Sequence, residues 1–198
     1  MTDGNRRQPG ARRESFADKR ARHAEIDDPE IVLAAALRFL EVRQRSVAEA
    51  RRRLAQTGYR SELVDGAIER LVGLGILDDA AFAQTWVESR DRARPRGERA
   101  LRRELQVKGI DRGIVDESME GRRPEPGGAD DPDVAAAQAL IHRHASALAR
   151  IADPRKRRQR AYALLARHGF DADIATTIAA RAAIGPGDTS DEPGDASD

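Results

Sequence analysis

The stretch LQVKGID at residues 105–111 has two counterparts in the chain, LAQTGYR at residues 54–60 and LARHGFD at residues 165–171. In each copy a leucine lies four residues before a glycine, and a large apolar residue follows the glycine directly. A helix often ends at such a glycine, because glycine tolerates the left-handed backbone conformation and the next residue packs back on the preceding turn. The three copies therefore predict three helix–turn–helix pairs.

The surroundings of the three turns repeat as well. A short polar residue that can cap the second helix follows each turn, at Ser61, Asp111 and Asp171. A further helix is expected before each pair, over residues 29–43, 79–93 and 132–151, and no segment alternates with the period of two that a strand requires. We therefore predict an all-α protein of nine helices in three tandem three-helix repeats. Because units of about 45 residues bury little core alone, neighbours must share apolar faces, which predicts an elongated, curved chain of modules.

Composition excludes several classes of protein. Of 198 residues, 35% are charged, 39% hydrophobic and 4% aromatic, with 35 basic and 34 acidic side chains. Average globular proteins have about 25% charged and about 45–50% apolar residues, so one deep core is not expected. The absence of Cys excludes disulfides, thiol catalysis and Cys-type zinc sites. Apolar runs are too short to span a membrane, and the first residues lack the apolar core of a signal peptide, so we expect a soluble, cytoplasmic protein.

Shifts in charge and in Gly/Pro content suggest the domain boundaries. The last 14 residues contain five acidic and no basic side chains, which is typical of a disordered tail. The expected segments are a disordered basic arm (1–27), repeat one (28–77), repeat two (78–120), a Gly/Pro-rich linker (121–131), repeat three (132–184) and a disordered acidic tail (185–198).

The residues support a family resemblance. Residues 54–79 resemble the first repeat of the RecX family of recombination regulators. The run with Phe82, Trp86 and Arg90, continuing through PRG at 95–97 to LRRELQVKGI at 101–110, is similar to the most distinctive segment of that family. The third copy is more divergent, and the resemblance covers residues 30–182.

The resemblance implies a modulator of the RecA recombinase. Members of this family bind RecA filaments on single-stranded DNA, lie in the filament groove, and inhibit ATP hydrolysis, strand exchange and coprotease activity in recombination, DNA repair and the SOS response. They have no catalytic residues and no cofactor.

The motifs of the chain agree with a protein that is not an enzyme. It contains neither a GxxxxGK[ST] phosphate loop nor an HExxH motif. His142 and His144 lie two residues apart, too far around a helix to hold one metal ion from one face. We therefore expect no metal, no cofactor and no small-molecule substrate. Trp86 and Phe82 fall on one helix face, where core packing is favoured over a stacking platform for bases.

Basic side chains in repeats two and three are the candidate contacts to a partner. Arg96, Arg99 and Arg103 recur on one face of a helix, and the pairs Glu98–Arg102 and Glu104–Lys108 leave these three without an obvious local partner. Five of the six residues from 155 to 160 are basic, with no acid between them. The candidates for binding protein or DNA are Arg90, Arg92, Arg96, Arg99, Arg102, Arg103, Lys108, Arg155, Lys156, Arg157, Arg158 and Arg160.

Three functions remain open at this point. In the first, a monomer binds the RecA filament and its single-stranded DNA, and the arginine faces meet acidic protein surface and phosphate. In the second, the helix pairs bind DNA directly as helix-turn-helix modules. In the third, the repeats are a scaffold for other proteins. The acidic tail is expected either to compete with DNA for the arginine faces or only to keep the protein soluble.

Overall fold

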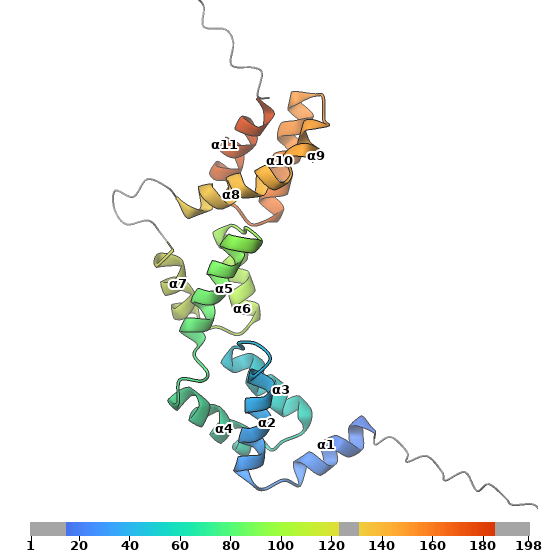
Figure 1. Ribbon diagram of the computed structural model, residues 1–198, viewed down its shortest axis with the longest axis vertical. Coiled ribbons are helices and arrows are strands. Elements are labelled where there is room, and N and C mark those ends of the chain that lie inside the picture. Colours follow the sequence, from blue (N-terminus) through green and yellow to red (C-terminus); the bar gives the residue numbers. More distant parts are fainter. Residues whose placement is uncertain (1–14, 123–130, 185–198) are drawn as a thin grey trace, which may run out of the picture. The chain divides into compact units, whose positions relative to one another are not determined.

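The computed structural model describes residues 15–122 and 131–184, and within these ranges the regular structure is helical throughout, without a strand. Contacts divide the chain into two compact units, residues 1–78 and residues 79–198 (Figure 1). The first unit contains repeat one, and the second contains repeats two and three. The all-α prediction and the three three-helix repeats are confirmed. The elongated, curved arrangement of the repeats stays a prediction.

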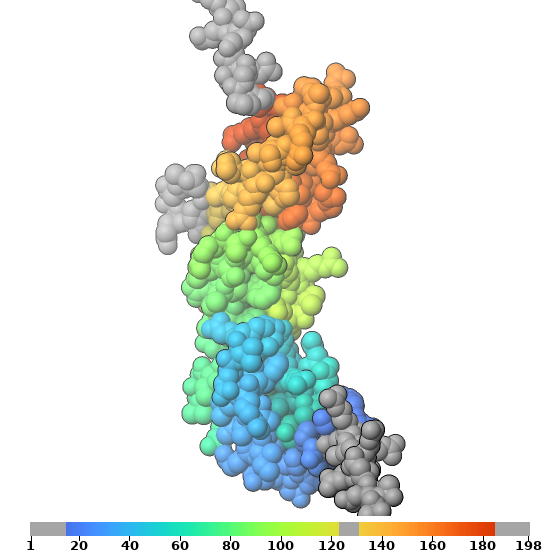
Figure 2. Space-filling model, turned by 45° about the vertical axis from the view of Figure 1, so that its right-hand side comes forward, coloured from blue at the N-terminus to red at the C-terminus, as the bar shows by residue number. Residues whose placement is uncertain are grey.

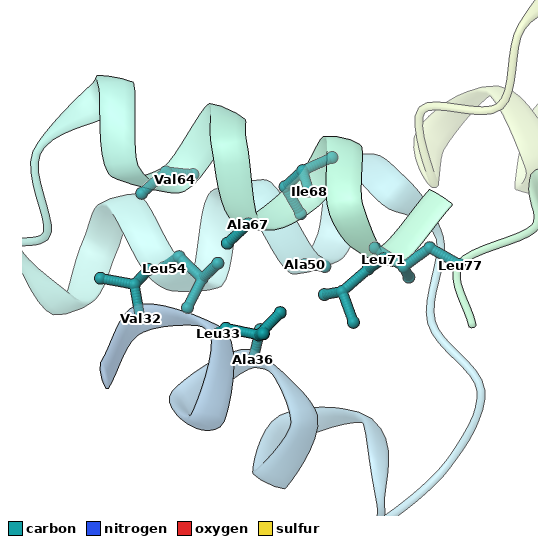
Figure 3. Packing of buried hydrophobic residues seen from close by; sticks show 10 residues of the cluster. All are labelled: Val32, Leu33, Ala36, Ala50, Leu54, Val64, Ala67, Ile68, Leu71 and Leu77. Carbon is teal, nitrogen blue, oxygen red and sulfur yellow. The ribbon is translucent and has the colours of Figure 1, made fainter. Parts of the chain in front are cut away.

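The first unit buries one apolar cluster between three helices. Side chains from α2 (Pro29–Leu40), α3 (Val47–Thr57) and α4 (Ser61–Gly73) point toward one another, and Leu77, which follows α4, lies beside Leu71 (Figure 3). Ser46 begins α3 with a capping box: its hydroxyl accepts from the Glu49 N–H at 3.1 Å, and its own N–H faces the Glu49 carboxylate. The four helices of the unit are α1 (Phe16–Ala24), α2 (Pro29–Leu40), α3 (Val47–Thr57) and α4 (Ser61–Gly73).

The second unit has a core in each of its two repeats. Repeat two packs around Phe82, Leu101 and Leu105, and repeat three packs around Leu165 and Phe170. Its helices are α5 (Asp79–Ala93), α6 (Glu98–Val107), α7 (Arg112–Glu120), α8 (Pro132–Arg143), α9 (Ala145–Ala149), α10 (Pro154–Arg167) and α11 (Ala172–Ala183).

Repeats two and three touch through bare backbone. The Gly97 N–H donates to the His168 carbonyl at 3.0 Å, and a Cβ on Gly97 would lie 2.4 Å from the Gly169 carbonyl oxygen. Gly169 has φ +82°, and a Cβ there would lie 2.5 Å from the Ala100 Cβ. The repeats therefore meet at two positions that tolerate no side chain, and their atoms are in contact in Figure 2 (green against orange).

An ion cluster joins the same two repeats. Arg122, just after α7, donates to both carboxylate oxygens of Asp91 on α5, at 2.9 and 2.7 Å, and also to Asp133 on α8. The second oxygen of Asp133 accepts the Glu98 N–H at 2.9 Å, so a residue of repeat three caps the first turn of α6. Burial disfavours the charge on Arg122, but the hydrogen bonds to Asp91 and Asp133 outweigh it, so the pKa of Arg122 is raised.

The structure corrects three details of the sequence analysis. The basic arm over residues 1–27 was expected to be disordered, but Ser15 caps a helix, α1, that packs against the end of α3; residues 1–14 lie outside the described residues. Ser61 is the first residue of α4 and does not cap it. The helix expected over residues 132–151 is interrupted at His144, which separates α8 from α9, so the described residues form eleven helices and not nine. The linker at 123–130 and the tail at 185–198 also lie outside the described residues.

Candidate functional site

A basic groove of about 770 Å³ lies in the second unit, between α5, α6 and the end of α10. One acidic side chain, that of Glu104, lines the groove. The six basic side chains that line it are Arg90, Arg96, Arg99, Arg103, Lys108 and Arg167. Five of these are candidates from the sequence, and the structure brings them together with Arg167, which the sequence analysis did not select.

Glu104 is already occupied by its own neighbours. One of its carboxylate oxygens accepts from the Trp86 indole N–H at 2.9 Å and from Arg90 Nε at 2.6 Å. Its other oxygen lies 3.5 Å from Arg96 Nε, a nitrogen that is buried and has no hydrogen-bond partner in the part of the chain that the structure describes. Glu104, the one acidic side chain that lines the groove, therefore mainly positions Trp86 and Arg90.

Trp86 lines the groove and contacts two cations. The Arg90 guanidinium and the Lys108 ammonium each lie 4.2 Å from the centroid of the indole ring, within the range of a cation–π contact. Phe82 stacks on Trp86 with the ring centroids 5.9 Å apart and is itself buried in the core. Core packing is thus the role of Phe82, and Trp86 holds Arg90 and Lys108 at the groove.

The remaining cations of the groove differ in how they are paired. Arg99, 70% exposed, donates to Asp171 at 2.7 Å across the boundary between repeats, so its partner is distant in the sequence and not local. Arg96 precedes α6, which corrects the expectation that it shares a helix face with Arg99 and Arg103. Arg103 and Arg167 are exposed, and neither has a hydrogen bond or ion pair within residues 15–122 and 131–184. These two side chains, one from each repeat, are the ones most available to an anionic partner.

Seven candidates from the sequence lie outside the groove, and three of these are Arg92, Arg102 and Arg157. Arg102 pairs with Glu98 at 2.7 Å, as the spacing predicts, and also with Asp116; the hydrogen bond to Glu98 is the main cause of its raised pKa. Arg92 is exposed near the end of α5. Arg157 donates to the carbonyls of Ile151 and Ala183 at 3.0 and 3.2 Å, so its guanidinium holds two parts of the chain together, and its binding to a partner stays a prediction.

A second basic surface covers the start of α10. A shallow depression of about 310 Å³ lies between α10 and α11, lined by Arg155, Arg158, Gln159, Tyr162 and Thr176. We call the exposed side chains of Arg155, Lys156, Arg158 and Arg160 the α10 face. None of the four side chains has a hydrogen bond or ion pair within the described ranges. The α10 face is therefore the least neutralised cluster of basic side chains that the sequence analysis selected.

Other kinds of site find little support in the described part of the chain. Residues 15–122 and 131–184 contain no group of three His, Asp or Glu side chains placed to hold a metal ion. No helix in these ranges is long and apolar enough to cross a lipid bilayer.

Comparison with known proteins agrees with this architecture. Three family models match: the first three-helix domain of RecX at residues 33–71, the second at residues 78–119 and the third at residues 131–178. A regulatory protein RecX from Corynebacterium efficiens is 31% identical over 186 residues, which cover 92% of this chain and 84% of that protein. The chain belongs to the RecX family. A regulatory protein RecX from Mycobacterium ulcerans is 40% identical to this chain over 88 residues. That match covers 44% of this chain and about half (51%) of the relative's own length.

Solved RecX structures share the fold. The crystal structure of RecX from Lactobacillus salivarius superposes with a TM-score of 0.66 at 22% identity, covering 77% of this chain and 94% of that one. A second RecX crystal structure gives a TM-score of 0.63 at 21% identity and covers 82% of this chain and 72% of the other. Both structures support the arrangement of tandem helical repeats. The family indicates a regulatory protein.

Proposed function

We propose that this RecX-family chain binds the RecA filament on single-stranded DNA and inhibits its ATPase, strand exchange and coprotease activities, acting in the cytoplasm as a monomer and without catalysis of its own. The observation that carries the proposal is the basic groove, where six cations line one cavity and the single carboxylate is occupied by Trp86 and Arg90. Such a surface suits carboxylates of a protein filament or phosphates of DNA, because guanidinium groups bind both through paired hydrogen bonds.

The groove joins two repeats, which suits a ligand that is itself extended. Arg103 comes from α6 and Arg167 from α10, and the backbone contact of Gly97 with His168 keeps these helices together. A partner that engages both arginines is held by both repeats at once. We infer that such binding restrains neighbouring RecA protomers and so slows ATP hydrolysis.

The experiment is a titration of RecA ATPase on single-stranded DNA with the wild-type chain and with the Arg103→Glu/Arg167→Glu variant. Both side chains are exposed and unpaired among the described residues, so the variant is expected to fold. We expect wild-type inhibition well below one chain per RecA protomer, and at least a tenfold higher half-inhibitory concentration for the variant. Arg20→Glu/Arg52→Glu, at two arginines of the first unit that are also exposed and unpaired in this part of the chain, changes the net charge by the same amount and is the control. Full inhibition by the folded double variant would refute the assignment of the groove.

The α10 face favours a second candidate, direct binding of DNA phosphate. Four unpaired cations on one helix are expected to give an affinity for DNA alone that falls steeply with salt, with a slope set by the number of phosphates contacted. Tight duplex binding without RecA, together with no effect on RecA ATPase at equal concentrations, would favour this candidate over the filament.

A further inference from the structure

The basic charge of repeat three is matched by the segment that follows it. Residues 132–184 contain nine Arg or Lys and four Asp, a net charge of +5, whereas residues 185–198 contain five acids and no base, a net charge of −5. The described part of the second unit gives the α10 face no acidic partner. A basic segment, residues 132–184, is therefore followed directly in the sequence by an acidic one, residues 185–198. The cations of the α10 face have no acidic partner among the described residues.

None of the four acids of repeat three pairs with the side chains of the α10 face. Asp153 caps α10, accepting from the backbone N–H groups of Arg155 and Lys156 at 2.8 and 3.4 Å, so its carboxylate is turned to the backbone. Asp171 and Asp173 lie at the beginning of α11, and Asp133 belongs to the ion cluster around Arg122. The first turn of α10 carries no acidic side chain, although the positive end of a helix dipole favours anions there.

The end of α11 is held beside the beginning of α10. Arg157 donates from one guanidinium to the Ile151 carbonyl before α10 and to the Ala183 carbonyl at the end of α11. Ala161 and Ala179 pack in the same small cluster, so the two helices run side by side. The chain therefore leaves α11 within a side chain's length of the α10 face.

We infer that the acidic segment 185–198 docks on the α10 face and excludes other anions from it. An extended segment of 14 residues spans up to about 45–50 Å, more than twice the roughly 21 Å length of α10, so all four cations are within its reach. Its carboxylates supply the counter-charges that the described residues do not. The docking itself is independent of the proposed function, whereas its consequence, a lower affinity for phosphate or carboxylate ligands at this face, rests on it.

Docking is tested on the full chain by NMR. Because the chain has no Cys, a nitroxide on the Ser197→Cys variant is a unique label. We expect it to broaden the amide signals of the first two turns of α10 at low salt, and this broadening to fall several-fold at about 1 M salt, where screening is nearly complete. The tether alone brings the label near, so the decisive comparison is with the same label on a tail in which four of the five acids are replaced. That tail carries Asp188→Asn, Asp191→Asn, Glu192→Gln and Asp195→Asn. Equal broadening in the two tails would overturn the inference.

The consequence is tested by binding of a labelled oligo-dT at low salt. The chain with four tail acids replaced should bind about three- to tenfold more tightly than the wild-type chain, since several exposed charge pairs are lost. A control variant removes four exposed acids elsewhere and should change the affinity much less: Glu41→Gln, Glu62→Gln, Glu69→Gln and Glu117→Gln. Charge-dependent broadening with no oligonucleotide binding by any variant would support docking and count against phosphate contact in the proposed function. If all variants bind the oligonucleotide with equal affinity and the two tails give equal broadening, the docking is overturned and the proposed function still stands.

Discussion

Replacing Arg122 by methionine is expected to destabilise the second unit by about 3 kcal/mol. The side chain of Arg122 is 7% exposed and those of Asp133 and Asp91 are 11% and 34% exposed. Removing one partner from a buried ion pair costs about 3–5 kcal/mol, because the remaining charge stays buried without compensation. The lower end of this range applies to Arg122→Met, because the Asp91 side chain is exposed enough to be hydrated once the arginine is removed. Methionine retains much of the apolar stem, so most of the loss arises from charge and hydrogen bonding.

Trp86 makes the measurement local, because it is the one tryptophan in the chain and lies in the second unit. With a denaturant dependence of about 2 kcal/mol/M, the urea midpoint followed by Trp86 fluorescence should fall by about 1.5 M. Arg103→Met is the control; this exposed arginine has no partner within the described residues, so it should shift stability by less than about 0.5 kcal/mol.

A triple variant separates buried charge from lost packing. Adding Asp91→Asn and Asp133→Asn to Arg122→Met removes all three charges and keeps an oxygen at position 133 for the Glu98 N–H. We expect the triple variant to recover about 1–2 kcal/mol relative to Arg122→Met, because no unpaired buried carboxylate remains. An Arg122→Met chain as stable as wild type, or a triple variant less stable than the single one, would refute the reasoning.

Two further predictions concern the same unit. Gly97→Ala should lower the free energy of unfolding by more than about 2 kcal/mol, because its Cβ would meet the Gly169 backbone, whereas Gly66→Ala, in open space on α4, should be neutral or stabilising by about 0.5–1 kcal/mol. Urea titrations followed by far-ultraviolet circular dichroism check both variants. Glu104→Ala should shift Trp86 emission to longer wavelength and cost about 1.5–3 kcal/mol, since the indole and Arg90 lose a charged hydrogen-bond partner. Glu117→Ala, on the exposed side of α7, is its control and should leave the emission spectrum unchanged.

The sequence was sufficient to predict the repeats because their signals are local. Gly58, Gly109 and Gly169 all adopt positive φ, at +108°, +79° and +82°, as the LxxxG pattern requires. The caps at Asp111 and Asp171 are also confirmed, each accepting an N–H two residues later. The glycine turns and the Asp caps depend on residues within one helical turn, so they can be predicted without knowledge of the tertiary structure.

The groove could be predicted only in part, because it depends on contacts between distant residues. The sequence showed that Arg99 lacked a local partner, but Asp171, 72 residues later, supplies one. Arg157 belonged to an undivided basic run, and nothing in that run marked it as the residue that binds backbone carbonyls. Arg167 stands alone in the sequence and enters the groove because α10 ends beside α6. Composition identifies the basic regions, but it does not separate cations that are paired within the fold from cations that are exposed to a partner.

The helix α1 could not be predicted from composition either, because its packing depends on a contact with the distant residue Gly58. Seven basic residues near the start of the chain favoured disorder, yet α1 packs on the turn of repeat one: a Cβ on Gly58 would lie 2.7 Å from the Arg20 carbonyl oxygen. His23 stacks on Tyr59 with the ring centroids 4.9 Å apart and its Nδ1 lies 2.9 Å from the Thr57 carbonyl. In repeat three, Gly169 is approached in the same manner by Ala100 of α6. In both places the glycine ends one helix and also presents bare backbone to another, so a single residue type fixes the turn and the packing against it.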